Sequence, residues 1–128
     1  MPETYQNESK CPILSAFNMI GGKWKMPILW QLYNSNLRYN ELKRRLGGIT
    51  NIMLTRCLRD LEDAGLVRRT QLSEIPPHVE YSLTEYSRKL GKALLDIKDW
   101  GEEMQSLQGK SDQNLTGEGK NEEGSITA

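Results

Sequence analysis

The stretch TNIMLTRCLRDLEDAG, residues 50–65, reads as an amphipathic helix with both ends marked. Thr50 is the expected N-cap and Gly65 follows the last helical turn as the expected C-terminal cap. The apolar side chains recur at helical spacing and predict one buried stripe. They are Leu54, Cys57, Leu58 and Leu61. The rest of the chain can then be interpreted by asking which segments cover this stripe and what the opposite face contacts.

The opposite face of this predicted helix carries mostly hydrogen-bonding and cationic side chains. It consists of Asn51, Ile52, Thr55, Arg56 and Arg59. Amide, hydroxyl and guanidinium groups are the groups that read base edges and bind phosphates. An ordinary solvent-exposed helix shows the same pattern, so the neighbouring segments must decide between the two interpretations.

The segment just before this helix favours a helix-turn-helix unit. Residues 39–46, YNELKRRL, form a second short amphipathic segment. A glycine-containing turn, Gly47-Gly48-Ile49, joins it to the main helix, as helix-turn-helix units require. Its basic residues Lys43 and Arg44 are candidate phosphate ligands.

The segment after the helix predicts a β-hairpin. Residues 66–71 and 79–83 read as strands separated by SEIPPH, and Pro76-Pro77 restricts the tip to extended backbone. A helix-turn-helix followed by such a hairpin is the plan of a winged helix. Three side chains of the wing either approach DNA or lie on a solvent-exposed hairpin, and the hairpin alone leaves both interpretations open. They are Arg68, Arg69 and His78.

The two ends of the chain predict a dimer. A first helix begins at Pro12, with Ile13 and Phe17 on its apolar face, and Gly21-Gly22 ends it. A long helix begins after Thr84 with a coiled-coil-like seam, which suggests a homodimer in which the first helix takes part; packing within the monomer is the alternative. The seam and its neighbour Trp100 comprise Leu90, Leu94, Ile97, Trp100, Gly101 and Met104.

Composition divides the 128 residues into a flexible arm (1–9), one domain (10–108) and a disordered polar tail (109–128). The net charge is zero, but residues 10–69 hold eleven Lys or Arg against four acids, and residues 70–128 hold six against eleven. A basic half points to nucleic acid. The expected fold is mainly α with a small β-wing (α+β): a winged helix-turn-helix with a long C-terminal dimerisation helix.

Other function classes are poorly supported. There is no membrane-spanning apolar run and no signal peptide, so we expect a cytoplasmic protein without a membrane partner. Two cysteines and one histidine do not suggest a metal site, and we expect no cofactor and no catalytic residues.

Cys11, next to Lys10 at a helix start, is either a redox-sensing thiolate or a small packing residue. Cys57 should be packing.

The sequence resembles the HxlR-type winged-helix transcriptional regulators, which are related to the MarR regulators. The resemblance spans roughly residues 10–104. It rests on Cys11-Pro12, IGGKWKMPILWQL, RYNELKRRLGGIT, MLTRCLRDLEDAGLVRR, IPPHVEYSLTEYSRKL and Asp99-Trp100-Gly101. It implies a dimeric bacterial or archaeal regulator, by default a repressor, whose recognition helices enter successive major grooves of a pseudo-palindromic operator on double-stranded DNA.

Carried over by position, the resemblance places Thr50, Asn51, Ile52, Thr55 and Arg56 in the groove and Arg59 on the backbone. Several family members use the cysteine at position 11 to sense quinones, aldehydes or disulfide stress. Ile52 and Cys57 stand where the family usually has polar residues, and His78 where many members carry arginine. The departures at Ile52 and Cys57 bear on which operator sequence is bound, and the departure at His78 bears on the wing contact.

Three alternatives remain beside a Cys11-switched regulator. The same regulator could answer to a small-molecule inducer instead. A winged-helix module that binds a protein is a different class, and the basic, hydroxyl-rich face argues against it. A thiol enzyme using Cys11 lacks a general base and a CxxC motif.

Overall fold

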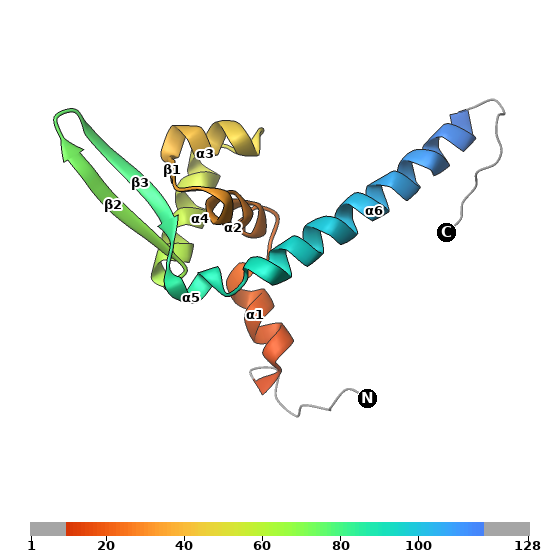
Figure 1. Cartoon of the computed structure of the whole chain (residues 1–128), viewed down its shortest axis with the longest axis horizontal. Coiled ribbons are helices and arrows are strands. Elements are labelled where there is room, and N and C mark those ends of the chain that lie inside the picture. Colours follow the sequence, from red (N-terminus) through yellow and green to blue (C-terminus); the bar gives the residue numbers. More distant parts are fainter. Residues whose placement is uncertain (1–9, 117–128) are drawn as a thin grey trace. The chain divides into compact units, whose positions relative to one another are not determined.

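The computed structural model describes residues 10–116, which are mostly helical and include a small three-stranded antiparallel sheet (Figure 1). This agrees with the predicted fold class. The chain forms two units: the first ends at Gly91 and the second begins at Lys92. The arm predicted for residues 1–9 lies outside the described residues. No helix in the described part of the chain has the length and apolarity needed to cross a membrane.

The first unit contains all three strands and the helices around them. Its elements are α1 (Pro12–Ile20), α2 (Lys25–Asn34), β1 (Leu37–Arg38), α3 (Tyr39–Leu46), α4 (Asn51–Asp63), β2 (Val67–Glu74), β3 (Pro77–Leu83) and α5 (Glu85–Arg88). The helix α6 (Gly91–Thr116) follows and makes up the described part of the second unit. The order helix-turn-helix, strand, strand matches the predicted winged helix.

The predicted caps and buried stripe of α4 are confirmed. The Oγ1 atom of Thr50 accepts the backbone N–H of Met53 at 3.1 Å, which satisfies one of the free donors of the first turn. At the other end Gly65 has a φ of +78°, and the Leu66 N–H reaches the Leu61 carbonyl at 2.9 Å. This is a Schellman ending, for which glycine is the preferred residue. All four stripe residues are buried: Leu54, Cys57, Leu58 and Leu61.

The apolar core of the first unit covers that stripe. It consists mainly of Ile28, Leu29, Leu32, Leu37, Leu42, Ile49, Leu66, Val67 and Leu83. These residues come from α2, α3, the sheet and the turns on either side of α4, so the core fixes α4 against both the preceding helices and the wing. The face of α4 that carries polar side chains is left outside.

The wing is a longer hairpin than the sequence predicts. The sheet order is β1-β3-β2, with β3 in the centre. Pairing of β2 with β3 continues to Glu74 opposite Pro77, so Ile75-Pro76 alone forms the turn. The predicted six-residue loop, 73–78, is therefore wrong at both ends. The extended backbone favoured next to proline is also strand geometry, which lets the strands run on to the tip.

The prediction of a single long helix from Thr84 is wrong. Thr84 does cap a helix, since its Oγ1 accepts the Ser87 N–H at 3.2 Å, but α5 ends at Arg88. A new helix then starts at Gly91, whose Cα lies so close to the Tyr33 ring that an added Cβ would collide with it. In this position the Tyr33 ring leaves no room for a Cβ at the junction, so a larger residue there would have to displace the ring.

The far end of α6 also differs from the prediction. The helix continues to Thr116, so residues 109–116, the first part of the expected disordered tail, are helical. The rest of that predicted tail, 117–128, lies outside the described residues. A polar composition does not by itself exclude a helix, because a solvated helix needs no apolar face at its end.

Candidate nucleic-acid interface

The outer face of α4 brings the predicted base-reading residues together. All of them are exposed, and with Asp60 they line one open depression along the helix. The residues are Asn51, Ile52, Thr55, Arg56 and Arg59. Thr50 lies at the start of the same face, but its hydroxyl oxygen already serves as the N-cap. The face offers amide, hydroxyl and guanidinium groups at the spacing of one exposed helix.

Ile52 is the one apolar side chain among these five residues of the predicted DNA-binding face. It is 75% exposed on the second residue of the helix. An exposed aliphatic group costs free energy in water, and on a groove-reading helix it suits the C5-methyl group of thymine. An isoleucine at position 52, where the family usually has a polar residue, is therefore compatible with a base-reading surface that prefers a different base.

Tyr39, which the sequence analysis did not single out as a site residue, ties α3 to this face. Its hydroxyl oxygen lies 3.1 Å from the Asn51 carbonyl oxygen, 3.4 Å from Asn51 Oδ1 and 3.1 Å from Thr55 Oγ1. The first turn of α3 is itself fixed, because the Arg38 N–H donates to Glu41 Oε1 at 2.9 Å. The only signal in the sequence was an aromatic residue at the start of a polar, basic helix.

A second depression lies between α4 and the wing, and it separates the two wing arginines. Arg69 lines it together with Arg59, and Glu62 is the only carboxylate among its lining residues. Successive strand residues point to opposite faces, so Arg68 lies on the other face of β2. The structure therefore brings Arg69, and not Arg68, next to Arg59 of α4.

The remaining predicted phosphate ligands line neither depression. Lys43 is half-buried and Arg44 exposed in the last turn of α3, where cations also stabilise the helix dipole. His78 is half-buried on β3, and its Nδ1 lies 3.3 Å from the Pro76 carbonyl oxygen. When Nδ1 carries the proton, that contact holds the ring against the turn of the wing.

The two cysteines occupy very different environments. Cys11 is half-buried and precedes α1 as its N-cap residue, as predicted. Cys57 is buried, and burial raises the pKa of its thiol; Lys25 and Arg56 oppose the rise, whereas Asp60 adds to it. Lys25 and Asp60 form an ion pair of 3.5 Å beside it. Cys57 is therefore a packing residue held as a neutral thiol, in agreement with the prediction.

Alkylation of the folded protein should distinguish these environments. At neutral pH we expect iodoacetamide to modify Cys11 at least about tenfold faster than Cys57, because only a thiolate that solvent reaches reacts. Peptide mass spectrometry over time measures both rates, and the denatured protein, in which both thiols should react alike, is the control. Equal rates in the folded protein would contradict the burial of the α4 stripe.

Comparison with known proteins identifies the family. The sequence profile of the HxlR-like helix-turn-helix family matches residues 19–108. The chain belongs to this family. It is 43% identical over 98 residues to YybR of Bacillus subtilis, an uncharacterized helix-turn-helix-type transcriptional regulator, covering 77% of this chain and 78% of YybR. The HxlR-like chain is thus a transcriptional regulator of the helix-turn-helix type.

Two solved structures support the winged-helix assignment of this HxlR-like chain. One is the redox regulator HypR in its oxidized form, with 43% identity and a TM-score of 0.70 over 73% of this chain and 96% of HypR. The other is a protein of Porphyromonas gingivalis assigned to the MarR family, with 34% identity and a TM-score of 0.72 over 80% of this chain and 98% of that chain. Both sequence identities are high enough to indicate relatedness as well as a shared fold.

The HxlR-like chain also exposes apolar residues that its own fold leaves uncovered. No residue of α1 is buried, and Ile13 and Phe17 are 78% and 57% exposed. On α6, Trp100 is 64% exposed, and Ile97 and Met104 are also exposed. The other predicted interface residues are less accessible: Leu94 is buried, and Leu90 and Gly101 are half-buried.

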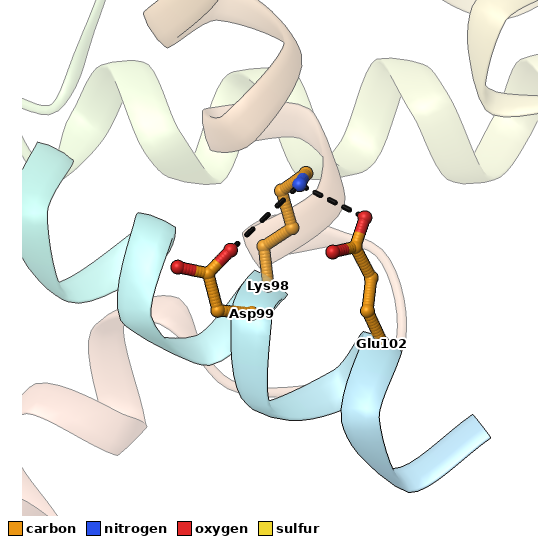
Figure 2. A network of polar contacts seen from close by, with 3 residues as sticks. All are labelled: Lys98, Asp99 and Glu102. Carbon is orange, nitrogen blue, oxygen red and sulfur yellow. Dashed lines mark hydrogen bonds and ion pairs between the residues drawn. The ribbon is translucent and has the colours of Figure 1, made fainter. Parts of the chain in front are cut away.

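Ion pairs mark a solvated side of α6. Lys98 Nζ lies 2.9 Å from Glu102 Oε2 and 3.9 Å from Asp99 Oδ1 (Figure 2), and the hydrogen bond to Glu102 raises the pKa of Lys98. Lys92 and Asp96 form a second pair, at 3.2 Å. Such exposed pairs contribute little stability, but they show which residues of the helix water can solvate.

Proposed function

We propose that this chain is a sequence-specific DNA-binding repressor that binds a pseudo-palindromic operator as a homodimer. The observation that carries the proposal is the outer face of α4, where five exposed residues line one depression on a helix held from behind by the core. Thr50, Asn51, Ile52, Thr55 and Arg56 would face the major groove, with Arg59 on the backbone.

Phosphate contacts would supply most of the affinity. Arg59 and Arg69 line one depression beside α4 and are the best placed to share a phosphate. Lys43, Arg44, Arg68 and His78 would add contacts from α3 and the wing. Positive charge placed on both sides of the reading helix fixes its position over the groove without reading sequence.

The dimer part of the proposal rests on the exposed apolar faces of α1 and α6, each of which needs a partner surface. A second copy presents the same faces, and two-fold symmetry makes such an interface self-complementary. Two linked recognition helices would then bind two half-sites one helical turn of DNA apart.

For the switch we propose oxidation or electrophile modification of Cys11. The likeness to HypR, whose name describes a redox regulator, and the place of Cys11 at the start of α1 support this. Release by a small-molecule inducer is the alternative.

The proposal includes a cytoplasmic location and no enzymatic activity. A protein-binding module remains the candidate from another class, and it would show no preference among DNA sequences.

The proposal is tested by titrating the protein onto the intergenic DNA upstream of its own gene at several salt concentrations. We expect tight binding that weakens steeply with salt, by about 0.9 in log–log slope for each phosphate neutralised. Arg56→Ala should relax the preference over random DNA, by about 5–150-fold. Arg69→Ala should weaken binding to all sequences alike and lower the slope by about one.

Arg68→Ala is the matched control for the wing, because Arg68 carries the same charge on the opposite face of β2. It should lower the slope less than Arg69→Ala does. Equal losses on operator and random DNA for both Arg56→Ala and Arg69→Ala would contradict the division into reading and phosphate-binding residues. Binding without any preference over random DNA would favour the protein-binding module.

A further inference from the structure

We infer that Tyr39 determines base specificity by fixing the Thr55 hydroxyl as a hydrogen-bond acceptor toward the groove. The inference rests on the proposed DNA-binding function and concerns the same face of α4. Tyr39 belongs to α3. It lines the depression between α4 and the wing but not the outer depression along α4, so it acts on a base through Thr55.

The contacts of Tyr39 leave one proton assignment that uses them all. Its hydroxyl lies 3.1 Å from the Asn51 carbonyl oxygen and 3.1 Å from Thr55 Oγ1. A carbonyl oxygen only accepts, and a phenol has a single proton. Tyr39 must therefore donate to Asn51, with Asn51 Oδ1 at 3.4 Å as a weaker second acceptor. The Thr55 hydroxyl must then donate to Tyr39.

This assignment determines what Thr55 can offer to a base. A threonine hydroxyl has one proton and two lone pairs. In a helix that proton commonly goes to the carbonyl four residues earlier, which for Thr55 is Asn51. Here the Asn51 carbonyl accepts from Tyr39 instead, and the Thr55 proton goes to the phenol oxygen. Toward the groove, Thr55 Oγ1 has only lone pairs.

Thr55 is placed to use that lone pair on DNA. It lines both depressions, the one shared with Tyr39 and Arg69 and the outer one shared with Asn51 and Arg56. In the major groove only adenine N6 and cytosine N4 are donors, whereas thymine O4 and guanine O6 and N7 are acceptors. Thr55 should therefore favour adenine or cytosine and disfavour thymine and guanine at the base it faces.

Two features of Tyr39 limit how far its side chain can move. The residue as a whole is half-buried. Its backbone lies in the first turn of α3, which the bond from the Arg38 N–H to Glu41 caps. A free hydroxyl could turn to suit any base, and the tyrosine removes that freedom.

The test is selection from a library of duplexes with a randomised central segment, using the full-length protein. Four proteins are compared: wild type, Tyr39→Phe, Thr55→Val and the double variant. The base pair read by Thr55 is the one whose preference Thr55→Val removes. There the wild type should prefer one base pair over the others, and the adenine or cytosine of that pair would be the base that Thr55 faces. Tyr39→Phe should lower that preference by about three- to tenfold and leave the other positions unchanged.

A merely structural role of Tyr39 predicts different results. It would weaken binding to all sequences alike, whereas our inference predicts a changed profile at one pair per half-site. In the Thr55→Val background, Tyr39→Phe should change nothing further. Tyr86→Phe, which removes a phenol hydroxyl from an exposed residue of α5, is the matched control and should keep the wild-type profile.

The failures are distinguishable. If the wild type enriches no sequence, the proposed function is overturned and the inference falls with it. If the wild type enriches a motif but Tyr39→Phe leaves the profile unchanged or lowers all affinities equally, only the inference is overturned. The same holds if Thr55→Val changes the preference at no base pair.

Discussion

Replacing Trp100 by glutamate is expected to convert the proposed dimer into monomers and to lower operator affinity by about 10²- to 10⁴-fold. Trp100 is 64% exposed on α6, so its replacement removes little packing from the chain itself. Large aromatic residues are the most common energetic centres of protein interfaces, and a charge in their place would lose its hydration on association. Without the dimer, each recognition helix binds its half-site alone.

Sedimentation and titration together measure this effect. Sedimentation gives the oligomeric state, and titrations onto the full operator and onto a single half-site give the coupling between the two helices. Ser106→Glu is the matched control: it adds the same charge to an exposed position three and four residues from Glu103 and Glu102, away from the seam. It should leave the dimer and the affinity unchanged. A dimeric Trp100→Glu variant with wild-type affinity would contradict the proposed interface.

The prediction of α4 from sequence succeeded because its signals are local. An N-cap threonine, an apolar residue every three or four positions and a glycine at the end act within the helix itself. The caps at Thr50 and Gly65 and the buried Leu58 could therefore be assigned before any neighbour was known. The exposed face could then be predicted as the remaining side of the same helix.

What the sequence missed depends on contacts between distant residues. After the break that follows α5, α6 begins at Gly91, whose close approach to Tyr33 involves a residue 58 positions earlier in the chain. The bonds from Tyr39 to Asn51 and Thr55 bridge two helices. Periodicity describes one helix at a time, so it locates a face but not the side chain from a neighbouring helix that restrains it.

The separation of Arg68 from Arg69 illustrates an intermediate case. Alternation along a strand is readable from sequence, but which of the two arginines faces α4 depends on the register of β2 with β3. The structure pairs Arg69 with Tyr81 and places it beside Arg59. The sequence could name both candidates, and only the packing of the sheet on the helix selects between them.

Oxidation should release the wild-type protein from its operator, and replacing Cys11 by serine should abolish that release. We expect diamide, which takes two electrons from a pair of thiols, to join Cys11 to Cys11 of the second copy in the proposed dimer as a disulfide. This should lower wild-type affinity on the order of 5–150-fold, the usual range of coupling between two sites. Cys11 is half-buried at the start of α1, so solvent reaches its thiol more readily than that of Cys57. Cys57 is buried and its pKa is raised by burial, so it should take no part.

Cys57→Ala is the control that separates the two thiols. It should keep the response to diamide, although the lost sulfur costs some stability in the core. Cys11→Ser should bind untreated operator as tightly as the wild type, and titrations with and without diamide, followed by reduction with dithiothreitol, measure both affinities and reversibility. Unchanged release by Cys11→Ser would remove Cys11 from the switch. Wild-type binding that is indifferent to diamide would leave the DNA-binding assignment intact and assign regulation to a small-molecule inducer.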